Sequence, residues 1–350
     1  MSYLNEQIIT YLGNKRKLLP LILRATEPTN KVCLDLFSGS GIVSRLFKEN
    51  GAKKVIANDL EDYSCIINRC YLANPEDYDM QKYETERKEV LCAPLITDGP
   101  IYTNYAPHEN NIKKGDRCFY TPENAILIDS NRKAIGHFVS PELQPFFIAP
   151  LLYEASVHVN TSGVFKGFYK TKEGIGQWGG EGRNATDRIC KKINVELYPI
   201  FSSKYCEVQV LQYDATAMSA IHCDVAYLDP PYNQHPYGSN YFMLNLIANG
   251  SWPQEISKVS GIPKNWNKSD FNRKKDALAA MQKTLDNVKA SDRMVISYNN
   301  EGFIQYEQML ELLSKYGDVS ILSEEYPTFR GCRNLSSRDI HTTEYLFIVR

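Results

Sequence analysis

Segments that would direct the chain into or across a membrane are missing from the sequence. The N-terminal stretch MSYLNEQIITYLGNKRKLLP has neither the unbroken apolar run nor the small-residue cleavage site of a secretory signal. No later run approaches the roughly 18 apolar residues that suggest a membrane-spanning helix. The sequence therefore predicts a cytoplasmic protein with no membrane partner.

Cysteine patterns typical of metal sites and disulfide frameworks are missing too. The nine cysteines are scattered and odd in number, and the closest pair, Cys65 and Cys70, is spaced too widely for a Cys-x-x-Cys site. Ordinary reduced thiols are the simpler interpretation. We expect no bound metal.

A general excess of positive charge is also missing, since the formal net charge is −1. Binding to nucleic acid needs only a local basic face, however. Two stretches, residues 166–192 and 258–275, are locally basic. Taken alone, each is more simply interpreted as solvated surface charge. The candidate DNA-facing cations in them are Lys166, Lys170, Arg183 and Lys268.

Short apolar runs alternate with helical periodicity at both ends of the chain. Strands are expected at 31–37, 54–58, 208–211, 225–228, 294–297, 319–322 and 345–349, and helices at 42–50, 63–73, 276–288 and 306–316. Such alternation predicts an α/β fold with a doubly wound, mostly parallel seven-stranded sheet. The last two strands are expected to form an antiparallel hairpin.

The pattern breaks down between residues 76 and 205. About 130 residues cannot be a loop, because structureless loops beyond roughly 12–15 residues are uncommon in compact domains. We therefore expect a folded module, inserted into a catalytic domain made of residues 1–75 and 206–350. Within the insert, residues 145–157 predict a buried helix interrupted at Pro150.

A glycine turn after the first strand indicates a nucleoside site, with Asp59 at the end of the next strand accepting from ribose hydroxyls. A dinucleotide is disfavoured: Ser44 stands where the third glycine would fall, and Asp35 would repel a pyrophosphate. Asp35 would instead attract the ammonium and sulfonium of S-adenosylmethionine, with Lys15 a candidate partner for its carboxylate. On its own, the glycine turn could also bind another nucleotide, or it could simply be a tight turn without a ligand.

The run Asp229-Pro230-Pro231-Tyr232 follows the strand at 225–228, at the sheet edge where open parallel sheets bind ligands. The prolines fix two φ angles and provide no N–H donors. The Asp229 carboxylate and the Pro230 carbonyl could accept the two hydrogens of an adenine amine and favour direct displacement. Tyr232 would stack on the flipped base. The competing interpretation is a rigid turn leaving a strand.

Together these motifs resemble the Dam-like class of N6-adenine DNA methyltransferases in the alpha arrangement, most closely its FokI-type branch. The matching motifs are Tyr11 to Lys15, Asp35 to Gly41, Asn58-Asp59, Asp214, Asp229 to Tyr232, Ser297 to Gly302, Arg330 to Asn334 and Glu344 to Leu346. The order of the motifs agrees as well, with the target-recognition insert preceding Asp229.

The resemblance implies a Rossmann-like fold, site-specific methylation of adenine in double-stranded DNA, and S-adenosylmethionine as cofactor. It also implies a restriction-modification setting, with a cognate restriction endonuclease as a candidate partner. The implied catalytic residues are Asp229, Pro230 and Tyr232. The expected cofactor-binding residues are Tyr11, Lys15, Asp35, Phe37, Ser38, Gly39, Gly41, Asp59, Asp214 and Asp229.

With DNA as the expected substrate, the basic stretches become candidates for phosphate contacts. In the run 164–170, Phe168 and Tyr169 could act as wedges that fill the space left by the flipped base; a hairpin with a buried aromatic face is the alternative. Arg330 and Arg333 could read guanine edges.

Two other functions stay open at this point. The same fold could methylate cytosine N4 in DNA, or RNA. Alternatively, the chain could be a catalytically inactive DNA-binding subunit, although every residue expected to carry the chemistry is present.

Overall fold

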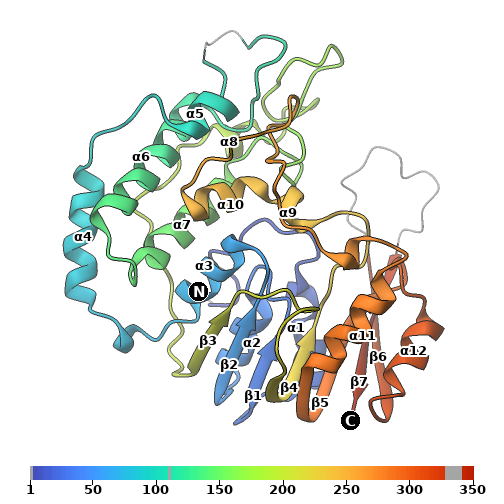
Figure 1. Ribbon diagram of the computed structural model, residues 1–350. Helices are drawn as coiled ribbons and strands as arrows, with labels where there is room; N and C mark the ends of the chain where they lie inside the picture. The colour runs from blue at the N-terminus through green and yellow to red at the C-terminus, as the bar shows by residue number, and fades with distance from the viewer. Residues whose placement is uncertain (1–2, 109–111, 328–340) are drawn as a thin grey trace.

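A seven-stranded sheet forms the lower half of the molecule in Figure 1. The computed structural model describes residues 3–108, 112–327 and 341–350. The strands are β1 (Val32–Asp35), β2 (Lys54–Asn58), β3 (Glu207–Leu211), β4 (Ile221–Leu228), β5 (Val288–Asn299), β6 (Val319–Pro327) and β7 (His341–Val349). Their order is β3-β2-β1-β4-β5-β7-β6, with only β7 antiparallel to its neighbours. The expected doubly wound sheet with a terminal hairpin is confirmed.

The chain reverses direction across the sheet between β1 and β4. From β1 it runs outward through β2 and β3, and then returns to pair β4 with the other side of β1, Asp35 opposite Tyr227. At such a reversal the two loops leave in opposite directions and open a crevice at the carboxyl edge of the sheet. The glycine turn after Asp35 and the loop that begins at Asp229 border this crevice.

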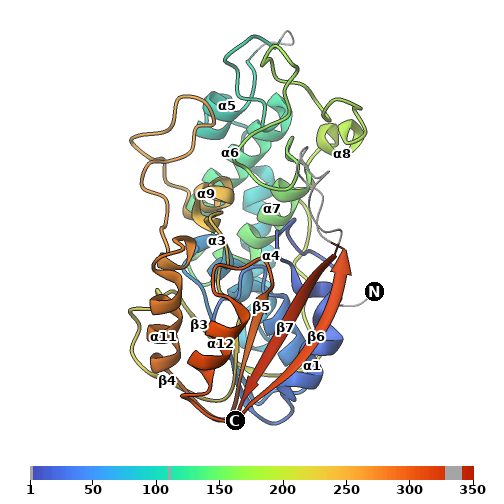
Figure 2. The same cartoon turned by 90° about the vertical axis from the view of Figure 1, so that its right-hand side faces the viewer.

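Helices cover both faces of the sheet, because side chains alternate along each strand. Val225 and Tyr227 of β4 pack with η1 (Lys15–Leu18), α1 (Leu19–Thr26) and α2 (Ile42–Glu49). Ala226 and Leu228 point the other way, toward α11 (Ala277–Asn287) and α12 (Tyr306–Leu313). Figure 2 shows α1 on one side of the strands and α11 and α12 on the other.

A helical module lies over the carboxyl edge of the sheet (Figure 1). From the expected insert it contains α4 (Met80–Cys92), α5 (Pro100–Tyr105), α6 (Pro122–Phe138), α7 (Gln144–Val157) and α8 (Thr186–Cys190). Its apolar core also takes in α3 (Asp62–Tyr71) and α10 (Phe242–Asn249), which lie outside the range 76–205. Three short helices, η2 (Pro75–Asp77), α9 (Tyr237–Asn240) and η3 (Asp270–Asn272), lie in connections.

The expected interruption at Pro150 is wrong, since α7 continues through this residue. Proline removes one helical hydrogen bond. The neighbours Ile148, Leu151 and Leu152 are buried in the core of the module, and this packing holds the helix together. Tertiary packing has therefore outweighed local propensity.

Long connections tie the module to the sheet domain. The Arg117 guanidinium donates to the carbonyl oxygens of Ser257 at 3.2 Å and Lys258 at 3.1 Å. The Tyr105 hydroxyl donates to the Gly261 carbonyl at 2.6 Å. The segment after α10, which goes on to border the crevice, is thus anchored to the module.

Several further features bear on the expectations from the sequence. The eight cysteines in the described part of the chain are free thiols. Within the same residues, no helix is both long and apolar enough to cross a bilayer.

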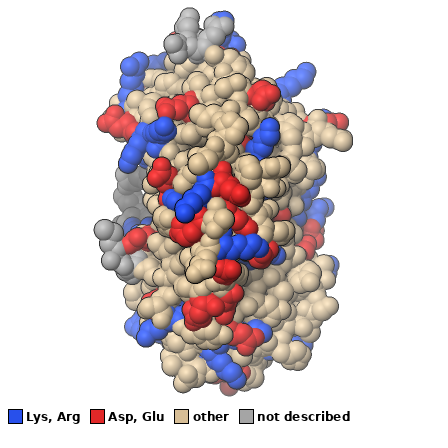
Figure 3. Space-filling model, turned by 90° about the vertical axis from the view of Figure 1, so that its left-hand side faces the viewer, with Lys and Arg blue, Asp and Glu red and all other residues tan. Residues whose placement is uncertain are grey.

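On the face that carries α4, basic and acidic side chains are interspersed (Figure 3). This face lacks the continuous positive surface that favours contact with DNA phosphates.

Candidate active site

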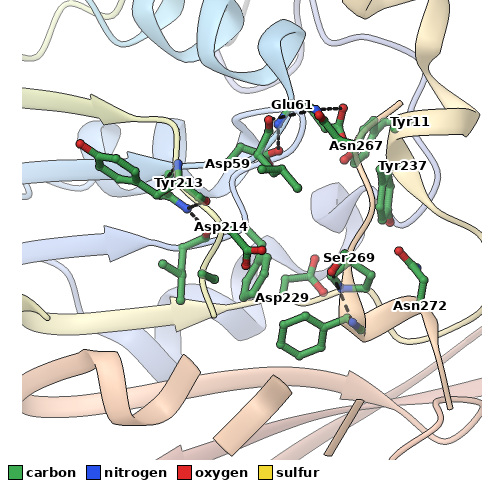
Figure 4. Close-up of a pocket in the computed structure, with 18 residues that line it drawn as sticks. Tyr11, Asp59, Glu61, Tyr213, Asp214, Asp229, Tyr237, Asn267, Ser269 and Asn272 are labelled. Atoms are coloured by element: carbon green, nitrogen blue, oxygen red, sulfur yellow. Dashed lines mark hydrogen bonds between the residues drawn. The ribbon is translucent and has the colours of Figure 1, made fainter. Parts of the chain in front are cut away.

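An open cavity of about 700 Å³ occupies the crevice between β1 and β4. Figure 4 shows Asp59, Asp214 and Asp229, from the loops after β2, β3 and β4, around the same space. Glu61 is a fourth carboxyl in the wall, whereas none of the described lining residues is Lys or Arg. Coulomb interactions in such a cavity favour a cationic ligand and oppose a phosphate.

The glycine turn after β1 is built from the predicted residues Ser38, Gly39 and Gly41. Gly39 and Gly41 have left-handed φ angles of 48° and 74°, which glycine adopts without steric cost. A Cβ at Gly39 would lie 2.9 Å from the Tyr11 ring. The Ser38 hydroxyl donates to the Asn58 carbonyl at 3.1 Å and accepts from the Asn68 amide at 3.0 Å. The turn is therefore fixed from both sides.

The Asp59 carboxylate joins this turn to the end of β2. Its two oxygens accept from the backbone N–H of Gly39 at 2.7 Å and of Glu61 at 2.9 Å. Burial raises the pKa of Asp59, while these hydrogen bonds oppose the rise. Hydrogen bonds from the Ser64 side chain and the Leu60 backbone also oppose the rise, so the carboxylate is held firmly in the cavity wall.

Asn58 ties three strand ends together, a role that its place in the acidic motif did not reveal. The Asn58 side chain donates to the carbonyl oxygens of Leu36 and Tyr213, each at 3.1 Å, and accepts from the Tyr213 N–H at 3.0 Å. It thereby sets the paths of the loops that carry Phe37 and Asp214. The Asp214 carboxylate accepts from the Thr216 N–H at 2.9 Å and hydroxyl at 2.8 Å.

Asp35 lies behind the cavity wall with 1% of its surface exposed. Its carboxylate accepts from the Ser44 hydroxyl at 2.7 Å. Burial raises the pKa of Asp35 to about 7, and the Ser44 hydrogen bond opposes the rise. A nearby cation would restore the charged form.

Lys15 bridges two carboxylates, Asp229 and Glu344. Its ammonium lies 3.0 Å from Asp229 Oδ1 and 3.0 Å from Glu344 Oε1. Burial raises the pKa of Asp229 to about 6, with Lys15 lowering it and Glu344 raising it. Burial by itself lowers the pKa of Lys15, but the two carboxylates raise it by more. The expected contact of Lys15 with a cofactor carboxylate stays a prediction.

The other two expected catalytic residues flank this ion pair. Pro230 is buried directly after Asp229. The Tyr232 ring packs edge-on against Tyr298, with centroids 6.2 Å apart, and the Tyr232 carbonyl accepts from the Phe303 N–H at 3.0 Å. The loop is held on both sides of Pro231, which lines the cavity.

Aromatic rings build two walls of the cavity. Tyr11 stacks on Tyr237, with centroids 5.1 Å apart, and on Tyr241, at 4.9 Å. Phe37 meets Phe271 edge-on at 5.5 Å. Four further cavity residues were not predicted, because nothing local in the sequence marks them: Tyr237, Phe271, Glu61 and Asn267.

The candidate DNA-binding residues are scattered over the module and the loop after α10. Phe168 packs against Phe119 in the module core, with 8% of its surface exposed, and so is not available as a wedge. The Lys170 ammonium lies over the Phe168 ring, 4.4 Å from its centroid. Tyr169 and Lys166 are half-buried, Arg183 and Lys268 are exposed, and Arg330 and Arg333 lie outside the described residues.

Comparison with known proteins identifies the family. Residues 11–309 match the D12 class of N6 adenine-specific DNA methyltransferases. The chain belongs to this family. It is an adenine-specific DNA methyltransferase, with DNA as substrate and S-adenosylmethionine as methyl donor.

Two relatives that match over nearly their full length support membership of this family. The type II methyltransferase M.CviAII of Paramecium bursaria Chlorella virus 1 is 31% identical over 97% of this chain and 98% of its own length. M.NlaIII of Neisseria lactamica is 30% identical over 97% and 99%. M.FokI of Planomicrobium okeanokoites is 26% identical over 97% of this chain, but the match spans only 52% of M.FokI. Among solved structures, one from Thermoplasma acidophilum is 11% identical with a TM-score of 0.36, and the match covers 100% of this chain and 98% of that chain.

The role of Asn58 can be tested with Asn58→Ala. The variant loses three hydrogen bonds and leaves buried backbone groups unpaired, so we expect a loss of roughly 2–3 kcal/mol in the free energy of unfolding and weaker cofactor binding. Denaturant unfolding and calorimetric titration measure the two effects. Asn265→Ala, at an exposed position, is the control, and equal stability of the two variants would contradict the role.

Proposed function

We propose that the protein methylates N6 of an adenine that has been flipped out of double-stranded DNA, by direct displacement at the loop Asp229–Tyr232. The observation that carries the proposal is the Asp229 carboxylate. It lies in the wall of a carboxyl-lined cavity at the switch point of the sheet, paired with Lys15. This is where an amine nucleophile would meet a cationic methyl donor.

The charge of the cavity fits S-adenosylmethionine, because a wall lined by carboxyl groups favours a cationic ligand. Asp59 would hold the ribose hydroxyls, Asp214 the adenine amine, and the buried Asp35 carboxylate would face the ammonium of the methionine half. The other residues that we assign to contacts with the cofactor are Tyr11, Lys15, Phe37, Ser38, Gly39, Gly41 and Asp229. When bound, the cofactor supplies an electrophilic methyl group on its sulfonium.

Asp229 and Pro230 would prepare the adenine amine for attack. The lone pair of that amine is delocalised into the ring, which makes it a weak nucleophile. The Asp229 carboxylate and the Pro230 carbonyl would accept its two hydrogens and favour a more tetrahedral nitrogen. Asp229 would then accept, through this hydrogen bond, the proton that the amine nitrogen has to lose once it is methylated. Tyr232 would support the base by stacking.

Base flipping follows from where the loop lies. A base stacked inside a duplex cannot reach a donor in a recessed cavity, so the nucleotide has to rotate out. The helical module rises over the carboxyl edge of the sheet (Figure 1), the edge at which the cavity lies. We assign target recognition to residues 76–205, with Tyr169 as the available wedge and Lys166, Lys170, Arg183 and Lys268 as phosphate contacts.

A restriction-modification setting is part of the proposal. Two relatives that match over nearly their full length are named type II methyltransferases. A cognate restriction endonuclease is the corresponding candidate partner.

Asp229→Ala tests the reaction centre. With DNA and isotope-labelled cofactor, we expect the wild type to place label on N6 of adenine and the variant to react at least about 100-fold more slowly. Mass spectrometry of the digested nucleosides measures both. Label on cytosine or RNA, or equal background rates for the two proteins, would refute the proposal.

Asp35→Asn tests the cofactor assignment. Removing a charged partner of the ammonium should weaken S-adenosylmethionine binding roughly tenfold to hundredfold, while DNA affinity is retained. Isothermal titration calorimetry gives the affinity, and the exposed Asp187→Asn variant serves as control. Unchanged cofactor affinity would rule out the assigned contact.

Lys166→Ala tests the DNA face. Loss of one phosphate contact should weaken binding to all sequences alike and reduce the slope of log affinity against log salt by about 1. Lys315→Ala, exposed beyond α12, should bind as the wild type does. A changed sequence preference with an unchanged slope would argue against a phosphate role.

A further inference from the structure

Glu344 completes the charged cluster around Asp229, although it lies on β7, more than a hundred residues further along the chain. Its side chain is 1% exposed, and its Oε1 lies 3.0 Å from the Lys15 ammonium. The Ser297 hydroxyl of β5 donates to the same oxygen. Lys15 and Glu344 are thus almost closed to water, whereas the Asp229 side chain is 19% exposed at the cavity wall; the three groups carry a formal net charge of −1.

We propose that Glu344 is a positioning residue for methyl transfer: it holds Lys15 between two carboxylates and keeps the cluster negative while the adenine amine becomes positively charged. This inference rests on the proposed role of Asp229 as acceptor for that amine. It assigns a function to the antiparallel end of the sheet, which the motifs around the cavity do not explain.

The charge balance of the reaction explains why a second carboxylate near Asp229 would speed methyl transfer. The amine nitrogen gains positive charge as its new bond to carbon forms, before its proton leaves. Lys15 alone beside Asp229 would give a neutral pair, which stabilises that charge poorly. Glu344 restores one negative charge, and in a water-poor site the effect is larger than in bulk solvent.

Burial of Glu344 is hard to explain by stability alone. Burying a second carboxylate beside the first has a desolvation cost, and apolar side chains of similar size often replace buried ion pairs without loss of stability. A buried carboxylate at this position, in contact with the lysine that pairs with Asp229, points to a role in the reaction.

The groups that face Asp229 determine how its charge responds to pH. They are Lys15 from η1, Asp35 from β1, Tyr227 from β4, Tyr232 from its own loop, Tyr237 from α9 and Glu344 from β7. Lys15 lowers the pKa of Asp229 and Glu344 raises it. Removing the charge of Glu344 should therefore lower the pKa of Asp229.

Glu344→Gln is the main test, measured as the single-turnover methylation rate at saturating cofactor and DNA over a range of pH. The wild-type rate should fall as pH drops through about 6, where Asp229 becomes protonated. In the variant we expect a plateau rate on the order of 10- to 100-fold lower, with the acid limb moved to lower pH. DNA affinity should change little.

Glu311→Gln is the matched control, because it makes the same substitution at an exposed carboxylate of α12, outside the cluster. It should keep the wild-type plateau and acid limb. Glu344→Asp keeps the charge, but its side chain is one methylene shorter, so the carboxylate lies farther from Lys15. Its plateau methylation rate should lie between those of the wild type and Glu344→Gln. If a thermal melt shows that Glu344→Gln does not fold, Glu344→Asp is measured in its place.

Three outcomes would overturn the inference: a wild-type rate and pH profile in Glu344→Gln, a lower plateau with an unmoved acid limb, or a wild-type plateau in Glu344→Asp. The second outcome would mark a purely structural role. If Asp229→Ala itself kept the wild-type rate, the proposed reaction centre would fail. If Asp229→Ala lost activity and Glu344→Gln did not, only the inference about Glu344 would fail.

Discussion

The burial of carboxylates at the junction of β1 and β4 is the constraint on which the rest of the site depends. Asp35 and Asp229 leave adjacent parallel strands at the switch point of the sheet, where the backbone opens a crevice. Charged groups in such a place need partners or a change in protonation. Lys15 supplies a partner for Asp229, whereas Asp35 has a pKa raised to about 7 by burial. A bound cation would favour the charged form of Asp35 and so compensate the cost of burying it.

The same constraint explains why distant segments meet at the cavity. Lys15 comes from the N-terminus, Asp229 from the middle of the chain and Glu344 from its last strand. The antiparallel pairing of β7 with β5 sets Glu344 opposite Asn299, close to the carboxyl edge. Asn58 performs a comparable task with neutral groups, fixing the loops after β1 and β3. Above them, the segment anchored by Arg117 continues into residues that close one side of the cavity.

Much of this architecture could be predicted from the sequence, because parallel strands buried on both faces leave clear apolar runs. The strands at 54–58 and 225–228 lie where those runs predicted them, and Asp229 follows the second one as expected. Pro150 was misjudged because a local rule gave way to tertiary packing. The contact between Lys15 and Glu344 was not predictable, since it depends on the register of β7 and has no local signature. The same holds for Phe271 and Asn267, which lie in a stretch whose composition indicated only basic surface.

The preference of this cavity for a cationic methyl donor can be measured by titrating the protein with S-adenosylmethionine in a calorimeter. The pH is set between the pKa values of Asp229 and Asp35, about 6 and about 7. Comparing buffers of different ionisation enthalpy gives the number of protons exchanged. Because a bound cation favours the charged carboxylates, the account predicts net proton release and an affinity that rises with pH through this range. A pH-independent affinity without proton release would contradict it.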